Sequence, residues 1–237
     1  MTMMFRMMIA ATAVSVAAPA AAQEVIVTAK RRGADNGYVG VVIPAQRPII
    51  VLKRSADYVI QEVRVAGDTR ETAARAEEIN ATLRNAIATA PKGGVELAVG
   101  DYVVEPLSSA NYRNLSYGSD GRPDTSQTTI LVKVRLAPGV DIAAARERVA
   151  RFVTSVDKVG RSTMKLWGEP TLSMVNPDQY RSAIIDLIAA DAASQAAKFG
   201  PAYGVDVTGL DRPVEWSRAG LTEVYLYLPS SYTVTRK

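Results

Sequence analysis

The spacing of hydrophobic residues predicts a long first helix over residues 68–94. Apolar side chains recur there every three or four positions, which places them along one face of a helix. This face consists of Ala76, Ile79, Leu83, Ala86, Ile87 and Ala90. Asp68 and Glu71 have capping-box spacing, so we expect each to bond the backbone N–H of the other. Pro91 and the two glycines that follow are expected to end this helix.

The same period predicts two further helices. One covers residues 141–160, and Asp141 is placed to cap its N-terminus. The other begins after Asn176, which is expected to cap it, and has Pro177 at its first position, where the missing N–H costs nothing. Gly200 is expected to close this third helix.

Alternation of apolar and polar residues predicts strands in five segments, 57–65, 95–105, 127–136, 162–167 and 222–228. In 127–136 one face is apolar, whereas Lys133 lies on the other, wetter face. One buried and one wetter face per strand is typical of an antiparallel sheet that is covered on a single side.

Together these elements predict an α+β fold, with a mostly antiparallel sheet and helices packed on one face. From residue 57 to residue 173 the order is strand, helix, strand, strand, helix, strand, which is the ferredoxin-like βαββαβ arrangement. A C-terminal helix and one or two more strands follow this core. The stretch 108–126 is rich in Ser, Asn, Gly and Asp and is predicted to be a long loop, and loops of this length are often functional.

Residues 1–22 have the features of an export signal. A short start with one basic residue precedes an uncharged apolar run, and Ala20 and Ala22 are the small residues that signal peptidase requires. This run is shorter than the roughly 20 apolar residues of a membrane-spanning helix. We therefore expect cleavage after Ala22, a periplasmic location and no transmembrane segment in the mature chain. Residues 23–47 are then a flexible basic segment, and residues 48–237 form the folded domain.

The composition excludes several classes of chemistry. The chain has no cysteine and no histidine, so it lacks a disulfide framework, a thiolate nucleophile, an imidazole base and the ordinary ligands of zinc. Its 28 basic and 24 acidic residues are nearly balanced, so no nucleic-acid-binding face is expected. We therefore predict a protein that is not an enzyme and has no catalytic residues, no cofactor and no metal ion.

One alternative is a serine-type cell-envelope hydrolase. Ser162 and Lys165 have the S-x-x-K spacing of penicillin-recognising serine enzymes, in which both side chains lie on one face of a helix. The alternation around them indicates a strand instead, on which residues three apart point to opposite faces. No K-T-G or S-D-N motif accompanies the pair.

Four tyrosines are candidates for a contact surface in a chain that has ten tyrosines and three phenylalanines. Tyr225 and Tyr227 share the outer face of the last predicted strand, and Tyr112 and Tyr117 lie in the long loop. These rings either cover the sheet against a helix or loop, or they form a subunit interface, since exposed aromatic rows favour association. The second interpretation predicts a homo-oligomer.

The composition of the helices and the order of the elements resemble those of a known family. The long Ala/Glu-rich helix ETAARAEEINATLRNAI is followed by paired strands, a shorter helix and an Ala-rich helix that runs into a strand, SAIIDLIAADAASQAAKFGPAYGVDVTGL. In this order, behind a signal peptide, residues 50–229 resemble the SIMPL domain, formerly a domain of unknown function. The resemblance implies export to the periplasm or outer membrane, a role in defence against oxidative stress, and ring-like oligomers in some members. It transfers no functional residue, because the family has no accepted catalytic set.

This chain departs from the family pattern near its N-terminus. Members often open with a Val-Thr-Gly-x-Gly strand just after the signal, and here that place holds PIIVLKRSADYVIQEVRV. Before it stand residues 24–32, EVIVTAKRR, which resemble the TonB box, an extended peptide that adds a strand to the sheet of TonB. Either this segment docks on an envelope partner, as in a TonB-linked accessory protein, or it is a basic tail that matches by chance.

Overall fold

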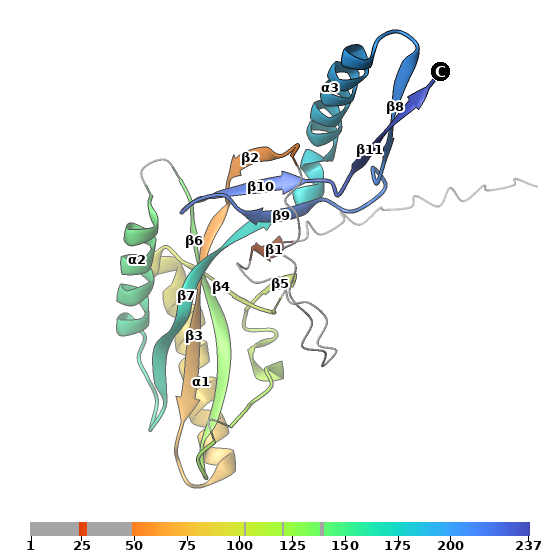
Figure 1. Ribbon diagram of the computed structural model, residues 1–237. Helices are drawn as coiled ribbons and strands as arrows, with labels where there is room; N and C mark the ends of the chain where they lie inside the picture. The colour runs from red at the N-terminus through yellow and green to blue at the C-terminus, as the bar shows by residue number, and fades with distance from the viewer. Residues whose placement is uncertain (1–23, 28–48, 102, 120, 138–139) are drawn as a thin grey trace, which may run out of the picture.

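The structure is a computed structural model, and it describes residues 24–27, 49–101, 103–119, 121–137 and 140–237. A closed sheet covered by two helices forms the body, and a helix with a two-stranded antiparallel sheet extends from one end of it (Figure 1). Three α-helices combined with antiparallel sheets confirm the α+β class. The predicted signal peptide, residues 1–22, lies outside the described residues.

Six antiparallel strands close into a barrel in the order β1-β5-β4-β6-β3-β7, with β1 paired to both β5 and β7. Their bounds are β1 Glu24–Val27, β3 Tyr58–Gly67, β4 Glu96–Val99, β5 Val103–Pro106, β6 Ser126–Arg135 and β7 Thr163–Val175. β3 is the central strand, because it pairs with β6 along its whole length and with β7 on its other edge.

The helices α1 (Thr72–Gly93) and α2 (Ile142–Ser155) pack against one face of this sheet and against each other. Their apolar stripes meet the apolar side chains of β3 and β6 that point toward the helices, and these groups form the main core. Ile79 and Phe152 are fully buried there. The carboxylate of Asp141 accepts a hydrogen bond from the first turn of α2, so the predicted cap is confirmed.

The start of α1 differs from the prediction. Glu71 is itself the N-cap, and its carboxylate accepts hydrogen bonds from two backbone N–H groups of the first turn. Asp68 lies outside the helix and pairs with Arg161, so the predicted capping box is wrong. The reason is that β3 extends to Gly67, and the chain then needs the following residues to turn into the helix. Gly94 ends the helix as predicted, because it adopts the left-handed conformation and caps the C-terminus, whereas Pro91 lies inside the last turn and does not stop the helix.

Closure of the sheet is the main departure from the predicted open arrangement. The segment 95–105, predicted as one strand, is divided into β4 and β5 by a turn at Gly100. Gly100 has a φ of 121°, and a Cβ there would lie 2.0 Å from the carbonyl oxygen of Val103, so the turn requires glycine. Because β5 folds back, the face expected to be wetter becomes the barrel interior. Leu131 and Lys133 are buried on that face.

β1 comes from the segment predicted to be flexible. Val25 is buried in the main core, and Ile26 is buried in the second core, which fills the barrel interior. The folded part of the chain therefore begins earlier than the predicted boundary at residue 48. A strand of four residues has too little alternation to be distinguished from an extended tail by sequence. Residues 28–47 of the predicted flexible segment lie outside the described residues.

The third helix does not join the other two on the sheet. α3 (Arg181–Phe199) packs against the two-stranded sheet of β8 (Tyr203–Thr208) and β11 (Ser231–Arg236), because α1 and α2 already cover the barrel face. α3, β8 and β11 are termed the arm. The short 3-10 turn η2 (Pro177–Tyr180) precedes α3, and Asn176 makes no side-chain capping hydrogen bond, contrary to the prediction.

A small sheet in the order β2-β10-β9 lies between the barrel and the arm. Its strands are β2 Leu52–Ser55, β9 Glu215–Arg218 and β10 Glu223–Tyr227, and a second 3-10 turn, η1, covers Tyr112–Asn114. Val224 and Leu226 are fully buried, as the alternation predicted. The indole N–H of Trp216 in β9 donates to the carbonyl oxygen of Ile26 at 3.3 Å and so ties this sheet to β1.

Candidate functional site

Polar side chains from five strands meet at one end of the barrel, some inside it and some exposed at its rim, and are termed the barrel cluster. They are Glu24 of β1, Tyr58 of β3, Glu96 of β4, Lys133 and Arg135 of β6, and Ser173 of β7. Each belongs to the alternating set of its strand that faces inward, so closure of the sheet brings them together.

Lys133 and Glu24 form a buried ion pair at the centre of the barrel cluster. Their side chains are only 7% and 11% exposed. Ser173 donates a hydrogen bond of 2.6 Å to the second oxygen of Glu24, and the carboxylate of Glu96 lies 3.5 Å from the Lys133 nitrogen. A charge that is removed from water is costly unless it is paired, so this ion pair holds β1 to the barrel interior.

Tyr58 extends the barrel cluster from the ion pair to the rim. Its hydroxyl donates to Glu96 at 3.1 Å and accepts from Arg135 at 2.6 Å, while the Lys133 nitrogen lies 4.0 Å from the centre of its ring. Burial, followed by the hydrogen bond to Glu96, raises the pKa of Tyr58. The phenol therefore keeps its proton and acts as a bridge between the charged groups.

A pocket of about 300 Å³ lies beside the barrel cluster. Glu24, Glu96 and Lys133 line one side, and apolar side chains that include Ile87 and Leu107 line the other. Among the described residues, no group of three or more acidic side chains is arranged to hold a metal ion. The polar groups at the pocket are paired with one another, an arrangement suited to holding strands together.

Comparison with known proteins does not assign this chain to a family. No protein-family model matches it, and no curated protein matches it. None of the helices in the described part of the chain is long and apolar enough to cross a membrane. Inferences about function therefore rest on the sequence pattern and on the geometry.

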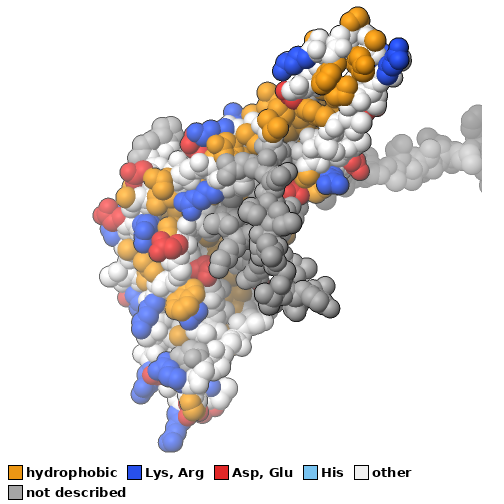
Figure 2. Space-filling model, in the orientation of Figure 1, with side chains coloured by type: hydrophobic (Ala, Val, Ile, Leu, Met, Phe, Trp, Pro, Cys, Tyr) orange, Lys and Arg blue, Asp and Glu red, His pale blue; other side chains and the backbone are white. Residues whose placement is uncertain are grey.

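The arm exposes four large apolar side chains. They are Leu187 and Phe199 of α3, Tyr203 of β8 and Val234 of β11, each at least 40% exposed. Figure 2 shows apolar side chains gathered along the arm. The first half of α3 buries Ile184 and Ile188 in the main core and Ala192 is buried further along, whereas no residue of β8 or β11 is buried. A pair of strands with no buried residue of its own has marginal stability, so the arm is a candidate docking surface.

Hydrogen bonds hold the base of the arm in place. Arg181 donates to the backbone carbonyl oxygens of Leu210 at 2.8 Å and Arg212 at 2.6 Å. The hydroxyl of Tyr232 in β11 donates to the carbonyl oxygen of Ile188 at 3.3 Å, and burial is the main cause that raises the pKa of Tyr232. The arm therefore has a defined direction while its apolar side chains stay uncovered.

The four tyrosines predicted as contact residues lie in two separate parts of the molecule. Tyr112 is buried in the main core, so its ring offers little surface to a partner. Tyr117 is partly exposed, and its hydroxyl donates to Asn80 of α1 at 2.9 Å, which fastens the long loop to the helix. Tyr225 and Tyr227 are half-buried on the face of β10 that points away from the core. The structure does not bring the two pairs together (Figure 1).

Ser162 and Lys165 lie in different surroundings. Ser162 is buried, with its Oγ 2.5 Å from the Oγ1 of Thr82 in α1, and both oxygens accept from the backbone N–H of Val159. Lys165 is exposed on β7. The serine hydroxyl therefore satisfies a buried backbone group, and the lysine does not orient it.

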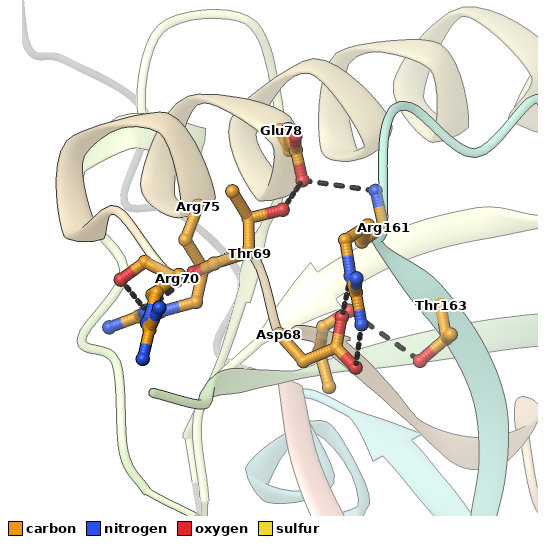
Figure 3. A network of polar contacts seen from close by, with 8 residues as sticks. Asp68, Thr69, Arg70, Arg75, Glu78, Arg161 and Thr163 are labelled. Atoms are coloured by element: carbon orange, nitrogen blue, oxygen red, sulfur yellow. Dashed lines mark hydrogen bonds and ion pairs between the residues drawn. The ribbon is translucent and has the colours of Figure 1, made fainter. Parts of the chain in front are cut away.

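A polar network joins the start of α1 to the start of β7 (Figure 3). Arg161 donates two hydrogen bonds, of 2.7 and 3.1 Å, to the carboxylate of Asp68, which lowers the pKa of Asp68. Glu78 accepts from the Thr69 hydroxyl at 2.6 Å and from the backbone N–H of Arg161 at 3.0 Å, and these bonds lower its pKa. Gly160 permits this approach, because a Cβ there would lie 2.2 Å from the Glu78 carboxyl carbon.

Sequence reasoning missed the barrel cluster because its members are distant along the chain. Glu24 and Lys133 are 109 positions apart, and no local pattern relates them. One signal was present, since Lys133 stands between Val132 and Val134 in a strand that is otherwise largely apolar. A lysine in such a strand suggests a buried partner, but the sequence does not say which acidic residue supplies it.

Proposed function

We propose that this protein is a non-enzymatic, exported protein of the SIMPL type that acts by self-assembly or by binding partners in the cell envelope. The order of its elements supports the family resemblance, and the strand order β4-β6-β3-β7 beneath α1 and α2 supports a ferredoxin-like core. By the same resemblance, its site of action is the periplasm, in association with the outer membrane, and its role is protection against oxidative stress.

The exposed apolar surface of the arm carries the assembly part of this proposal. Contiguous apolar surface on a soluble protein marks sites of association, because covering it removes that surface from water. The arm has little core of its own, so contact with a partner would bury Leu187 and Phe199 at little cost in rearrangement. Self-assembly is favoured because every copy carries the same uncovered arm.

Light scattering coupled to size-exclusion chromatography tests this function on the mature chain, residues 23–237. At tens of micromolar, the mature protein is expected to have a mass greater than that of one chain. The double variant Leu187→Ser with Phe199→Ser is expected to run as a monomer, because two hydroxyls replace the largest uncovered apolar groups of α3. Unchanged circular dichroism would show that the variant is folded.

Leu221→Ser is the matched control. Leu221 is 73% exposed, but it lies in the turn between β9 and β10 and not on the arm. This variant is expected to assemble like the unaltered protein. A mature protein that stays monomeric at every concentration would contradict the proposal, and so would an arm variant that assembles normally.

A further inference from the structure

β1 completes the barrel although it is short and comes from the far N-terminal end of the described chain. Its four residues pair with β7 along their whole length, and Glu24 and Val25 also pair with β5. Without β1, the facing edges of β5 and β7 would present unpaired backbone groups to solvent. These edges therefore form a groove that accepts one extended segment, termed the β5–β7 groove.

The β5–β7 groove selects its occupant by charge and by alternating side chains. Lys133 at its base pairs with Glu24, and Ser173 donates to the same carboxylate. The next two side chains enter different cores, with Val25 in the main core and Ile26 in the barrel interior. The groove thus recognises an acidic residue followed by two apolar residues, which the sequence provides at Glu24–Ile26.

The sequence separation between β1 and the next described residue is long enough for β1 to reach a second copy. About 20 residues, 28–48, separate it from the next described residue, and a chain of that length reaches up to about 70 Å when extended. A second copy offers the same β5–β7 groove with the same Lys133. Exchange of β1 between copies therefore reproduces every contact of the closed barrel without creating a new interface, which is the condition for domain swapping.

We propose that β1 of one copy occupies the β5–β7 groove of a second copy in the assembled protein. This rests on the proposed function, because copies must first associate through the arm before they exchange β1, and it names the partner segment and the groove that receives it. Each copy donates one strand and accepts one, so exchange closes a dimer or a ring. The ion pair between Glu24 and Lys133 is then an intermolecular contact.

Charge reversal separates exchange from closure within one chain. In the mature chain, Glu24→Lys and Lys133→Glu each place like charges together when β1 occupies its own barrel. When the two variants are mixed, exchange restores an opposite pair in both grooves. Mixing is expected to raise the amount of complex, measured by native mass spectrometry, by about tenfold or more over either variant alone. A mixture with no more complex than its components would overturn the proposal.

A cysteine pair gives an independent measurement, because the chain contains no cysteine of its own. Val25 and Val103 face each other across the β1–β5 pairing, and Val103 is 40% exposed. After oxidation, mature Val25→Cys with Val103→Cys is expected to form disulfide-linked dimers or larger species on a non-reducing gel. A product that is entirely monomeric and cross-linked would overturn exchange. If such a protein still assembles by light scattering, the proposed function stands and only the strand exchange fails.

Discussion

The barrel and the arm bury apolar surface in different ways. The barrel has two cores, one under α1 and α2 and one in its interior, and the polar groups of the barrel cluster are paired with one another. The arm joins the main core through Ile184 and Ile188 of α3, and further out it places this single helix on a two-stranded sheet in which no residue is buried. The barrel therefore obtains its stability from enclosed cores and paired charges, whereas the arm leaves apolar surface that a partner can cover.

This difference separates two kinds of sensitivity. Changes inside the barrel should lower the free energy of unfolding, whether β1 belongs to the same chain or to a second copy. Changes on the arm should leave unfolding of the monomer unaltered and act on association, which depends on concentration. Measuring both quantities on one set of variants tests whether the two regions are distinct in this way.

Lys133→Met should have the largest effect on the barrel. The substitution leaves the Glu24 carboxylate buried without its cation, which costs about 3–5 kcal/mol of unfolding free energy. Urea denaturation measures the loss. The double variant Glu24→Gln with Lys133→Met removes both charges and should recover much of the stability. A single variant as stable as the unaltered protein would show that the ion pair does not hold β1.

Thr82→Val should have the next largest effect. The hydroxyl of Thr82 is fully buried and accepts from the backbone N–H of Val159, so its loss costs about 1–3 kcal/mol. Thr89→Val, at a half-buried position of the same helix, is the control and should be nearly neutral. Equal urea midpoints for the two variants would contradict a structural role for the Thr82–Ser162 pair.

Asp141→Ala should cost about 1 kcal/mol, because it removes the N-cap of α2. The start of α3 in the arm provides the contrast. Tyr180 occupies the N-cap position there and makes no side-chain capping bond, so Tyr180→Phe should change the stability of that helix start little. Thermal unfolding, measured by circular dichroism, compares the two variants. An equal fall in their unfolding midpoints would contradict the expectation that only the helix start in the barrel depends on a side-chain cap.

The arm double variant, Leu187→Ser with Phe199→Ser, should change the unfolding free energy of the monomer by no more than about 0.5 kcal/mol. Leu187 is 41% exposed and Phe199 is 52% exposed, so about half of each side chain is already in contact with water in one chain. Urea denaturation at a protein concentration below that of assembly gives this value. A loss as large as that of Lys133→Met would mean that the arm belongs to the same cooperative core as the barrel.

The smallest expected effect is the loss of unfolding free energy when acid protonates the network at the start of α1. Hydrogen bonds lower the folded-state pKa of Asp68, Glu71 and Glu78 below the values of the unfolded chain. The unfolded chain therefore takes up protons first, so this contribution is present above about pH 4 and is lost as the pH falls further. Glu78→Gln should make the urea midpoint less sensitive to pH between about 3 and 5. An unchanged pH dependence would remove Glu78 from this role.

Much of the local structure was predictable from neighbouring residues. The apolar stripe of α1, the cap at Asp141 and the stop at Gly94 follow from helical spacing and backbone preference. The alternation of β10 also predicted which of its side chains are buried. The capping box failed because strand and helix compete for the residues between Gly67 and Glu71, and their spacing does not say where the strand ends.

The candidate sites were less predictable, since they depend on distant contacts. Tyr112 and Tyr117 were identified as surface candidates from a loop-like composition, yet Tyr112 is in the core and Tyr117 bonds to α1. Lys133 was assigned to a wetter face, because alternation distinguishes two faces of a strand but does not show that the second face will be enclosed. The turn at Gly100 is what encloses it.

The sequence by itself determined the α+β class, the positions of the helices and several strands, and the lack of cysteine and histidine chemistry. These properties depend on spacing within a few turns or on residue type alone. Only the tertiary structure decided that the sheet closes, that residues 24–27 complete it, and that α3 leaves the sheet to form the arm. Those features depend on which surfaces remain to be covered after α1 and α2 have packed, and on an ion pair between residues 109 positions apart.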